Sequence, residues 1–516
     1  MSLNAVALTP IIPIVFAFAL PMLSIVFKGN RKVVEGYALV GTGLTLLTSV
    51  LLFLKVYSSS APLVYSFGGW RAPVGIIYEV DRLGALMAIV TTFLMFLITI
   101  YSYRYIEEGL EWYYTLYLGL EAGLLGVFLT GDAFNLFVMI EVTSIAAYAL
   151  VMFYRNRWRA LSAGLRYAFI GAVGTTIYFI ALAIIYYAFG TLNMANMSAL
   201  LHGMTFQVVG SPYASLVKAS AVALALAVWA FLIKAAIVPN HFWLPDAHPA
   251  APTPVSAVLS GLVVNAGVYA VMRFIFTIYR GTVPGVIHAL SVVLMVVGAA
   301  SALLGAILMV VQRDVKRLIA YSTIMHMGYI VMAIGVGSQL ALEAAIFHTV
   351  NHAIAKALLF LSVGIFIRMA GSRDIARLSG LGRKASVAMI PLAISALSLV
   401  GIPPFNVFFS KLLLFDALSQ RSYVLALVLV VSSVIALTSY MRVLYEVWLG
   451  EGGEGSENGR KAGASMTAVC VFLAIICIAL GIAAPYVVAH YIHPAASQAV
   501  NYTAYVKAAL SSVLKV

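Results

Sequence analysis

Three titratable side chains recur at one-turn spacing within an apolar stretch of the chain. His348, His352 and Lys356, in IFHTVNHAIAKALLFL, lie four residues apart. On a helix this spacing places all three on one face, within about 12 Å along the axis. Histidine titrates near neutral pH and exchanges protons through either ring nitrogen. This face is therefore a candidate segment of a proton wire; for either histidine alone, a core residue bonded to a backbone carbonyl is the alternative.

Three more charges lie inside apolar segments. Glu141 is near the middle of FNLFVMIEVTSIAAYALVMF, Lys234 precedes Pro239, and Lys411 follows Pro404. A charge at membrane depth costs at least ~3 kcal/mol, so such groups pair with one another or face water. Burial away from water favours the neutral form of a lysine, whereas a nearby carboxylate favours the charged form. If a contact between Glu141 and Lys234 forms and breaks, Lys234 would therefore hold a proton and then release it. A purely structural pair is the alternative.

Further ionisable residues in apolar runs are weaker candidates. His326, in YSTIMHMGYI, is either a relay group or a core histidine. Glu121, central in its run, and Glu343, at the start of another, are either buried participants or water-facing rim groups.

The sequence contains no recognisable motif for binding a metal ion or a nucleotide. Cys470 and Cys477 lie seven residues apart in one apolar run, with no CxxC motif and no histidine cluster, and are predicted to be packing residues. Neither a dinucleotide-binding fingerprint nor a phosphate-binding loop is present. We therefore expect no metal and no cofactor in this chain, and any redox chemistry must sit elsewhere.

The composition of the chain indicates which kind of secondary structure positions these titratable side chains. The chain has 516 residues, of which 63% are hydrophobic and 9% charged, against roughly 25% charged in soluble domains. Apolar runs of about 20 residues, each able to cross a bilayer core, recur from end to end. The net charge of +13 comes from Lys and Arg in short loops, which is typical of membrane topology signals rather than of nucleic-acid binding. We expect an all-α integral membrane protein.

The apolar runs predict about fourteen transmembrane helices. They fall at about 5–27, 34–56, 83–103, 112–130, 133–154, 162–188, 215–238, 252–277, 286–311, 319–337, 341–367, 387–416, 422–446 and 464–490. The first is expected to be a retained helix rather than a signal peptide. An even number of crossings puts both termini on one side. Loops after odd-numbered spans hold roughly twice as many Lys and Arg as the others, which places both termini outside a plasma membrane.

Prolines interrupt two of these helices at corresponding places. The seventh runs into IVPNHFWLPDAHPAAPTP, and the twelfth contains GIPPF. Proline breaks a helix, and irregular backbone at membrane depth persists only beside protein or a water-filled cavity. With five-helix units at 112–277 and 286–446, each break falls in the fourth helix of its unit, the pattern of an inverted-repeat transporter.

The rest of the single membrane domain, 1–516, follows from this division. Residues 1–111 supply the first three helices, 464–490 the last one, and 491–516 a short, partly amphipathic tail. The Gly-rich, charged segment Gly450 to Gly463 is expected to be a flexible cytoplasmic loop.

Four motifs carry a resemblance to a known family over nearly the whole chain. They are TGDAFNLFVMIEVTSIAAYAL, KAAIVPNHFWLPDAHPAAPTPVSAVLSG, FHTVNHAIAKALLFL and GIPPFNVFFSKLLLF. In order and spacing they resemble the antiporter-like subunits of respiratory complex I, Mrp-type cation/proton antiporters and membrane-bound hydrogenases. TGD followed by FNLFV is most similar to the Mrp D-type and hydrogenase-associated branch. The resemblance implies fourteen helices, inverted five-helix repeats, and broken helices seven and twelve.

The resemblance also implies roles for individual residues. Six side chains match the family's proton path: Glu141 and Lys234 as its charged pair, His348, His352 and Lys356 as its central relay, and Lys411 as its exit-side lysine. One position departs from the family, since Asn265 stands where a lysine is usual. An amide does not exchange protons at physiological pH, so either water beside Asn265 carries the proton or the link between the two halves is weakened.

Our leading hypothesis is a proton-translocating subunit that is driven by other membrane subunits of a respiratory-type complex. Na⁺/H⁺ exchange is the alternative within this class, although an interior rich in lysine and histidine suits protons better than sodium. A structural scaffold, in which the charges only fix helix packing, and a stand-alone solute carrier are alternatives from other classes.

Overall fold

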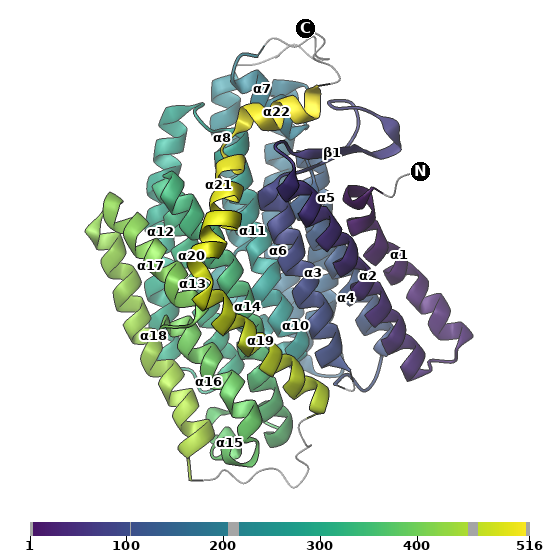
Figure 1. Ribbon diagram of the computed structural model, residues 1–516, viewed down its shortest axis with the longest axis vertical. Coiled ribbons are helices and arrows are strands. Elements are labelled where there is room, and N and C mark those ends of the chain that lie inside the picture. The colour runs from purple at the N-terminus through teal and green to yellow at the C-terminus, as the bar shows by residue number, and fades with distance from the viewer. Residues whose placement is uncertain (1–3, 104, 205–215, 452–462, 512–516) are drawn as a thin grey trace.

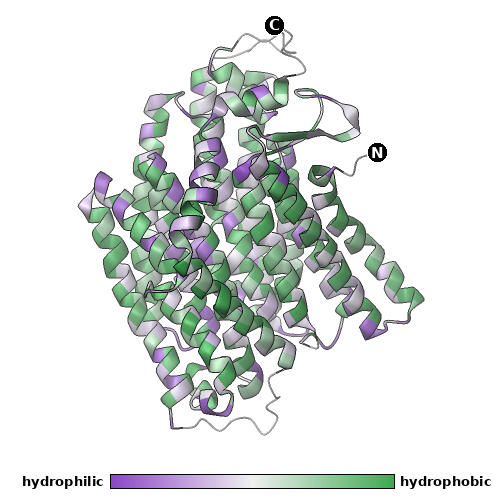
Figure 2. Ribbon diagram, viewed as in Figure 1, coloured by the Kyte–Doolittle hydropathy of each residue, from purple (hydrophilic) through white to green (hydrophobic). Residues whose placement is uncertain are grey.

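The computed structural model describes residues 4–103, 105–204, 216–451 and 463–511. Long helices lie roughly side by side in one bundle (Figure 1). Hydrophobic residues dominate their length (Figure 2). Twelve of the described helical segments are long and apolar enough to cross a membrane.

The N-terminal part contains three long helices and a hairpin. These elements are α1 (Ala5–Val26), α2 (Arg31–Ser58), β1 (Leu63–Ser66), η1 (Phe67–Gly69), β2 (Ile77–Val80) and α3 (Arg82–Ser102). The strands are antiparallel, with Leu63 opposite Val80. This hairpin was not among the sequence predictions.

The first predicted five-helix unit has an interrupted fourth helix and an irregular fifth. Its elements are α4 (Leu110–Leu129), α5 (Ala133–Val151), α6 (Trp158–Phe189), α7 (Met194–Leu201), α8 (Leu216–Lys234), η2 (Asn240–Phe242), α9 (Trp243–Ala250), α10 (Thr253–Val258), η3 (Leu259–Val263), α11 (Val264–Met272) and η4 (Arg273–Ile278). The segments η3 and η4 are π-helical, so Thr253–Ile278 forms one span with two widened turns.

The second predicted unit and the C-terminal elements follow. They are α12 (Pro284–Val310), α13 (Val315–Val336), α14 (Gln339–Ala370), η5 (Ile375–Leu378), α15 (Leu381–Lys384), α16 (Ser386–Val400), α17 (Asn406–Arg421), α18 (Tyr423–Leu449), α19 (Ala464–Ile482), α20 (Ala484–Val487), η6 (Val488–Ile492), α21 (His493–Ala499) and α22 (Tyr502–Leu510). The predicted loop from Gly450 to Gly463 lies almost entirely outside the described residues.

The helical membrane fold is confirmed, and every predicted span has a helical counterpart. The twelve candidate spans leave out α4, in which Glu111, Glu121 and several aromatic residues interrupt the aliphatic run, and the interrupted pair α16 and α17. The total of fourteen crossings and the division into two inverted repeats therefore stay predictions.

Both predicted helix breaks are confirmed. Helix α8 ends at Lys234, and regular α-helix resumes only at Trp243. Helix α16 ends at Val400 and α17 begins at Asn406. At the second break Gly401 has φ +94°, and a Cβ there would lie 2.9 Å from Lys411 Cδ. The turn thus requires glycine and presses directly on the stem of a candidate lysine.

The C-terminal segment returns to the end of the bundle that carries the hairpin. Arg82 N donates to Gln498 Oε1, and Thr277 Oγ1 donates to the Ala499 carbonyl. Helix α22 contacts α7 and β1, and α1 also contacts β1 (Figure 1). The described ends of the chain therefore lie at one end of the bundle, as an even number of crossings requires.

Candidate functional site

A buried histidine cluster joins α13 to α14. His326 Nδ1 lies 3.0 Å from His348 Nε2, and His348 Nδ1 lies 3.0 Å from Ser410 Oγ on α17. The rings of His326 and His352 lie 5.2 Å apart, centroid to centroid. All three histidines are fully buried. His326, the doubtful candidate of the sequence, is thus brought into contact with the two predicted relay histidines.

This chain of contacts permits two opposite proton arrangements. A neutral histidine has one donor and one acceptor nitrogen, so His326 either donates to His348 or accepts from it. In the first arrangement His348 donates to Ser410 Oγ, whose hydroxyl donates to the Val407 carbonyl at 3.0 Å. In the second, the Ser410 hydroxyl turns to donate to His348. When His326 Nε2 takes up one proton and Ser410 Oγ releases its original one, the proton of each intervening hydrogen bond shifts by one group and the first arrangement becomes the second, which is the behaviour of a relay.

Two buried lysines lie beside the histidine cluster. Lys356 donates to the Ile319 carbonyl and to Ser322 Oγ, both on α13. Lys411 donates to the Val400 carbonyl at 2.9 Å, where α16 breaks, and to Ser433 Oγ at 2.8 Å. Both ammonium groups are therefore held by neutral acceptors.

Tyr329 connects Lys411 to the histidines. Its ring lies 5.4 Å from Lys411 Nζ and 5.4 Å from the His326 ring, centroid to centroid. Its hydroxyl lies 2.7 Å from Ser432 Oγ. The second half of the chain thus assembles histidines, lysines and hydroxyls from α13, α14, α17 and α18 into one buried polar group.

The first half places Lys234 against α5. Lys234 Nζ donates to Ser144 Oγ at 2.7 Å and to Tyr148 Oη at 3.2 Å. Glu141 precedes Ser144 by less than one turn on the same helix. It also lines a lateral cavity of about 390 Å³ with Phe137 and residues of α6. The predicted partners therefore share one region, although no ion pair joins them among the described residues.

The eighth span is wedged between the two groups. At Gly267 an added Cβ would lie 2.7 Å from Ala235 N, next to Lys234. At Gly261 it would lie 2.9 Å from the Ala353 carbonyl, next to His352. Only glycine allows such close backbone contact on both sides. Asn265 lies between these two glycines, where its amide nitrogen donates to the Gly261 carbonyl at 2.6 Å.

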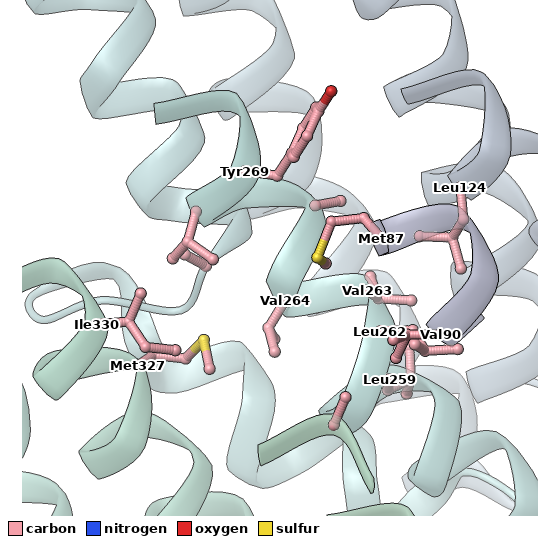
Figure 3. Close-up of a cluster of buried hydrophobic side chains, with 14 of the residues drawn as sticks. Met87, Val90, Leu124, Leu259, Leu262, Val263, Val264, Tyr269, Met327 and Ile330 are labelled. Atoms are coloured by element: carbon pink, nitrogen blue, oxygen red, sulfur yellow. The ribbon is translucent and has the colours of Figure 1, made fainter. Parts of the chain in front are cut away.

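Apolar side chains surround this part of the eighth span. Figure 3 shows Val263 and Val264 of the span with Met87 and Val90 of α3 and with α13 residues such as Met327. The π-helical turn η3 ends at Val263, two residues before Asn265, and such turns are frequent at functional sites. The Asn265 Oδ1 atom is buried without a hydrogen-bond partner among the described residues. Asn265 is thus a polar point in the apolar layer that separates Lys234 from the histidine cluster.

The remaining two acidic candidates lie away from both groups. Glu121 is fully buried in α4, and neither carboxyl oxygen has a hydrogen-bond partner among the described residues. Glu343 lies at the start of α14, where Oε1 is 2.8 Å from His493 Nδ1 on α21. The Glu343 side chain is buried, which does not fit the water-facing alternative of the sequence.

Sequence reasoning missed His248 and Lys316. The fully buried ring of His248 stacks on Phe360 of α14 at 4.7 Å, centroid to centroid, one turn beyond Lys356. Neither ring nitrogen has a hydrogen-bond partner among the described residues. Lys316 Nζ donates to the Ala251 carbonyl at 2.8 Å, and Lys316 lines a cavity of about 330 Å³. The sequence signal that could have identified His248 is its position within the DAHPAAPTP motif.

The described residues contain no group of three His, Cys, Asp or Glu side chains arranged to hold a metal ion. Cys470 and Cys477 are buried and unpaired within α19.

Comparisons with known proteins cover nearly the whole chain. The sequence profile described as "NADH:quinone oxidoreductase/Mrp antiporter, TM" matches residues 130–436. The D-type subunit of the Na(+)/H(+) antiporter of Alkalihalophilus pseudofirmus is 32% identical over 506 residues, with 97% of this chain and 99% of the relative covered.

Solved structures match as well. A chain of the membrane-bound sulfane sulfur reductase, an archaeal respiratory membrane complex, has a TM-score of 0.89 and 30% identity, covering 98% of this chain and 99% of that chain. A chain of the Mrp complex from Dietzia sp. DQ12-45-1b has a TM-score of 0.86 and 26% identity, covering 98% and 100%.

Proposed function

The chain belongs to the transmembrane family of NADH:quinone oxidoreductases and Mrp antiporters, and on that basis we propose that it moves protons through its buried Glu, Lys and His residues. It is an antiporter-like subunit of a multisubunit membrane complex. The observation that carries the proposal is the His326–His348–Ser410 row, in which each gap is 3.0 Å. Hydrogen-bonded, reversible groups of this kind conduct protons, whereas packing alone requires no such row.

The proposed path has two segments. Glu141 and Lys234 form the first, which meets the lateral cavity beside α6. His326, His348, His352, Lys356 and Lys411 form the second. Asn265, with water at its unpartnered oxygen, links them across the apolar layer of the eighth span.

A proton inlet at the arginine-rich end would feed the second segment. Lys316 borders the cavity of about 330 Å³ there. Its ammonium also donates to Ser256 Oγ at 3.2 Å, and that hydroxyl donates to the His248 carbonyl at 3.0 Å. His248 stacks on the α14 face that carries Lys356. The hydrogen bonds of this row end at the His248 carbonyl, so the proposed inlet requires water between Ser256, the unpartnered His248 ring and Lys356.

The proposed setting is the plasma membrane, crossed many times, with the arginine-rich end in the cytoplasm and both termini outside. The excess of Lys and Arg in alternate loops supports this orientation. Other membrane subunits are the expected partners, because the matched structures are multisubunit complexes.

Na⁺/H⁺ exchange is the second candidate, and the name of the Alkalihalophilus relative favours it. In this chain the buried ionisable groups of the second segment are histidines and lysines, which do not suit sodium. We therefore assign the proton to this chain and any sodium path to a partner subunit.

The decisive experiment is proton transport by the assembled complex in proteoliposomes. Lys234→Ala is expected to abolish pumping while the partner subunits stay bound. Lys218→Ala, at an exposed position of the same helix, is the control and is expected to pump normally. Undiminished pumping by assembled Lys234→Ala complex would show that Lys234 carries no proton.

A further inference from the structure

A large basic cavity lies at the arginine-rich end, outside the proposed path. It has a volume of about 880 Å³ and is bordered by α6, α9, the start of α13 and the turn after α14. Its charged lining residues are Arg157, Arg159, Arg166, Arg317, Arg373, Asp246 and Asp314. Five arginines against two carboxylates leave a net lining charge of +3. A cavity of this charge favours an anionic ligand.

The two carboxylates are already engaged by three of the arginines. Asp246 bridges Arg166 at 2.9 Å and Arg317 at 2.6 Å. Asp314 pairs with Arg373 at 3.3 Å. Two of the three excess positive charges therefore belong to the other two arginines, at the start of α6.

Those two arginines, Arg157 and Arg159, form no ion pair with a carboxylate among the described residues. Arg157 lies over the Tyr154 ring, with Cζ 4.7 Å from its centroid. This contact fixes the guanidinium while leaving its N–H donors for a ligand. An arginine fork matches the oxygens of a phosphate.

The surroundings indicate where the ligand's apolar part lies. Trp158, between the two arginines, is 76% exposed, and Phe169, three turns further along α6, is 74% exposed. Tryptophan with basic residues marks the membrane–water border, and an exposed apolar helix face below it lies at acyl-chain depth. The cavity thus opens at headgroup level, directly above a surface that suits hydrocarbon.

We propose that this cavity binds the phosphate of an anionic phospholipid, whose acyl chains lie along α6. Basic pockets between transmembrane helices on the cytoplasmic side are suited to such headgroups. A soluble anion would use the arginines but not the exposed Trp158 and Phe169. The site does not depend on proton conduction by the chain.

The lipid would also act on the first helix break. Pro245, Asp246 and Pro249 of α9 line the same cavity. A phosphate bound by Arg157 and Arg159 in this cavity would lie beside the Arg166–Asp246–Arg317 bridge, which links α6 to α9 and α13. An anionic lipid would thereby hold the broken helix in place.

The test measures phospholipid binding to the delipidated, assembled complex by native mass spectrometry, with short-chain phosphatidylglycerol as the probe. Since each arginine near the surface contributes about a five-fold factor in binding, Arg157→Gln/Arg159→Gln is expected to bind roughly 25-fold more weakly. The matched control, Arg377→Gln/Lys384→Gln, removes two charges at exposed positions outside the cavity, and is expected to bind like the unmodified complex.

Three results would overturn the proposal. The first is equal phosphatidylglycerol binding by the Arg157/Arg159 variant and the control. The second is binding of inorganic phosphate as tight as that of the lipid, which would make the site one for a soluble anion. The third is a variant complex that loses a neighbouring subunit while its lipid binding is unchanged. That result would show that the cavity is a contact site for another protein. If the double variant does not assemble, Arg159→Gln alone is measured, with an expected five-fold loss.

Discussion

Lys234 Nζ is bound by Ser144 Oγ at 2.7 Å, on the helix that also carries Glu141 three residues earlier. Residues three apart on a helix lie on one face. The lysine is therefore held by neutral hydroxyls one short step from the carboxylate with which it was expected to pair. Its movement between hydroxyl and carboxylate is the switching event that the proposed function requires.

Removing the Ser144 hydroxyl should trap the lysine. In Ser144→Ala, Lys234 retains only Tyr148 as a hydroxyl acceptor, so it is expected to shift onto Glu141. Loss of a hydrogen bond to a charged group costs roughly 1.5–3 kcal/mol, so we expect proton transport to slow about ten-fold or more. The measurement is the initial rate of proton uptake by proteoliposomes.

Thr143→Val is the control for that variant. Thr143 is buried in the same turn of α5, and its hydroxyl donates to the Met139 carbonyl rather than touching Lys234. Its transport rate should stay close to that of the unmodified complex. Equal slowing in both variants would show that the effect comes from packing of α5.

Two neighbouring serines on α18 both contact the Tyr329 hydroxyl, but of the two only Ser433 has a hydrogen bond to Lys411 among the described residues. Ser433 Oγ accepts from Lys411 Nζ at 2.8 Å, whereas Ser432 Oγ lies 2.7 Å from the Tyr329 hydroxyl. Ser433→Ala leaves the lysine with one acceptor, the Val400 carbonyl, and is expected to reduce transport about ten-fold. Ser432→Ala is expected to reduce it much less. Equal rates for the two variants would remove Lys411 from the proposed path.

A buried carboxyl at the start of α5 predicts a pH dependence of stability. Burial raises the pKa of Asp132 from 3.8 to about 6, against the opposing effect of its backbone hydrogen bonds. Between about pH 4 and pH 6 the folded chain holds a proton that the unfolded chain has released, so the free energy of unfolding falls as pH rises and levels off above pH 6. The shift of about two units corresponds to about 3 kcal/mol.

Asp132→Asn removes this titration and retains the side-chain acceptor for Asn135 N, which lies 2.8 Å from Asp132 Oδ1. The variant is expected to lack the decline in melting temperature between pH 4 and pH 6. Thermal unfolding of the purified complex, followed by tryptophan fluorescence, measures it. Asp416→Asn, at an exposed carboxylate, is the control and should follow the unmodified curve. A parallel decline in the Asp132 variant would contradict the assignment.

The elements of this chain were largely predictable because their signals are local. Apolar run length predicts the spans, and prolines at 239, 403 and 404 predict the breaks. The one-turn spacing from His348 to Lys356 predicts their common face, since helix period alone decides it. The hairpin escaped prediction because its strands have four residues each, too few for a periodic pattern.

The partners of the candidate residues were not predictable, because they depend on how separate helices approach. His326 of α13 contacts His348 of α14, and Lys234 donates a hydrogen bond to Ser144, which is ninety residues away in sequence. Serine and tyrosine hydroxyls are too common in a membrane protein to stand out as acceptors. His248 escaped for a similar reason, because its stacking on Phe360, a contact between separate helices, connects it with the relay face.

The link between the two segments supplies the last prediction. Asn265 Oδ1 is buried without a hydrogen-bond partner among the described residues, and water that bonds to such an atom stabilises it. In Asn265→Leu a side chain of similar size removes the polar point from the apolar layer. We expect proton transport to fall at least ten-fold with the complex intact. Asn196→Leu, at another buried asparagine with an unpartnered side chain among the described residues, controls for the substitution itself. Normal transport by Asn265→Leu would mean that the segments communicate without a proton crossing at this point, through the glycine contacts that press the eighth span on Ala235 and Ala353.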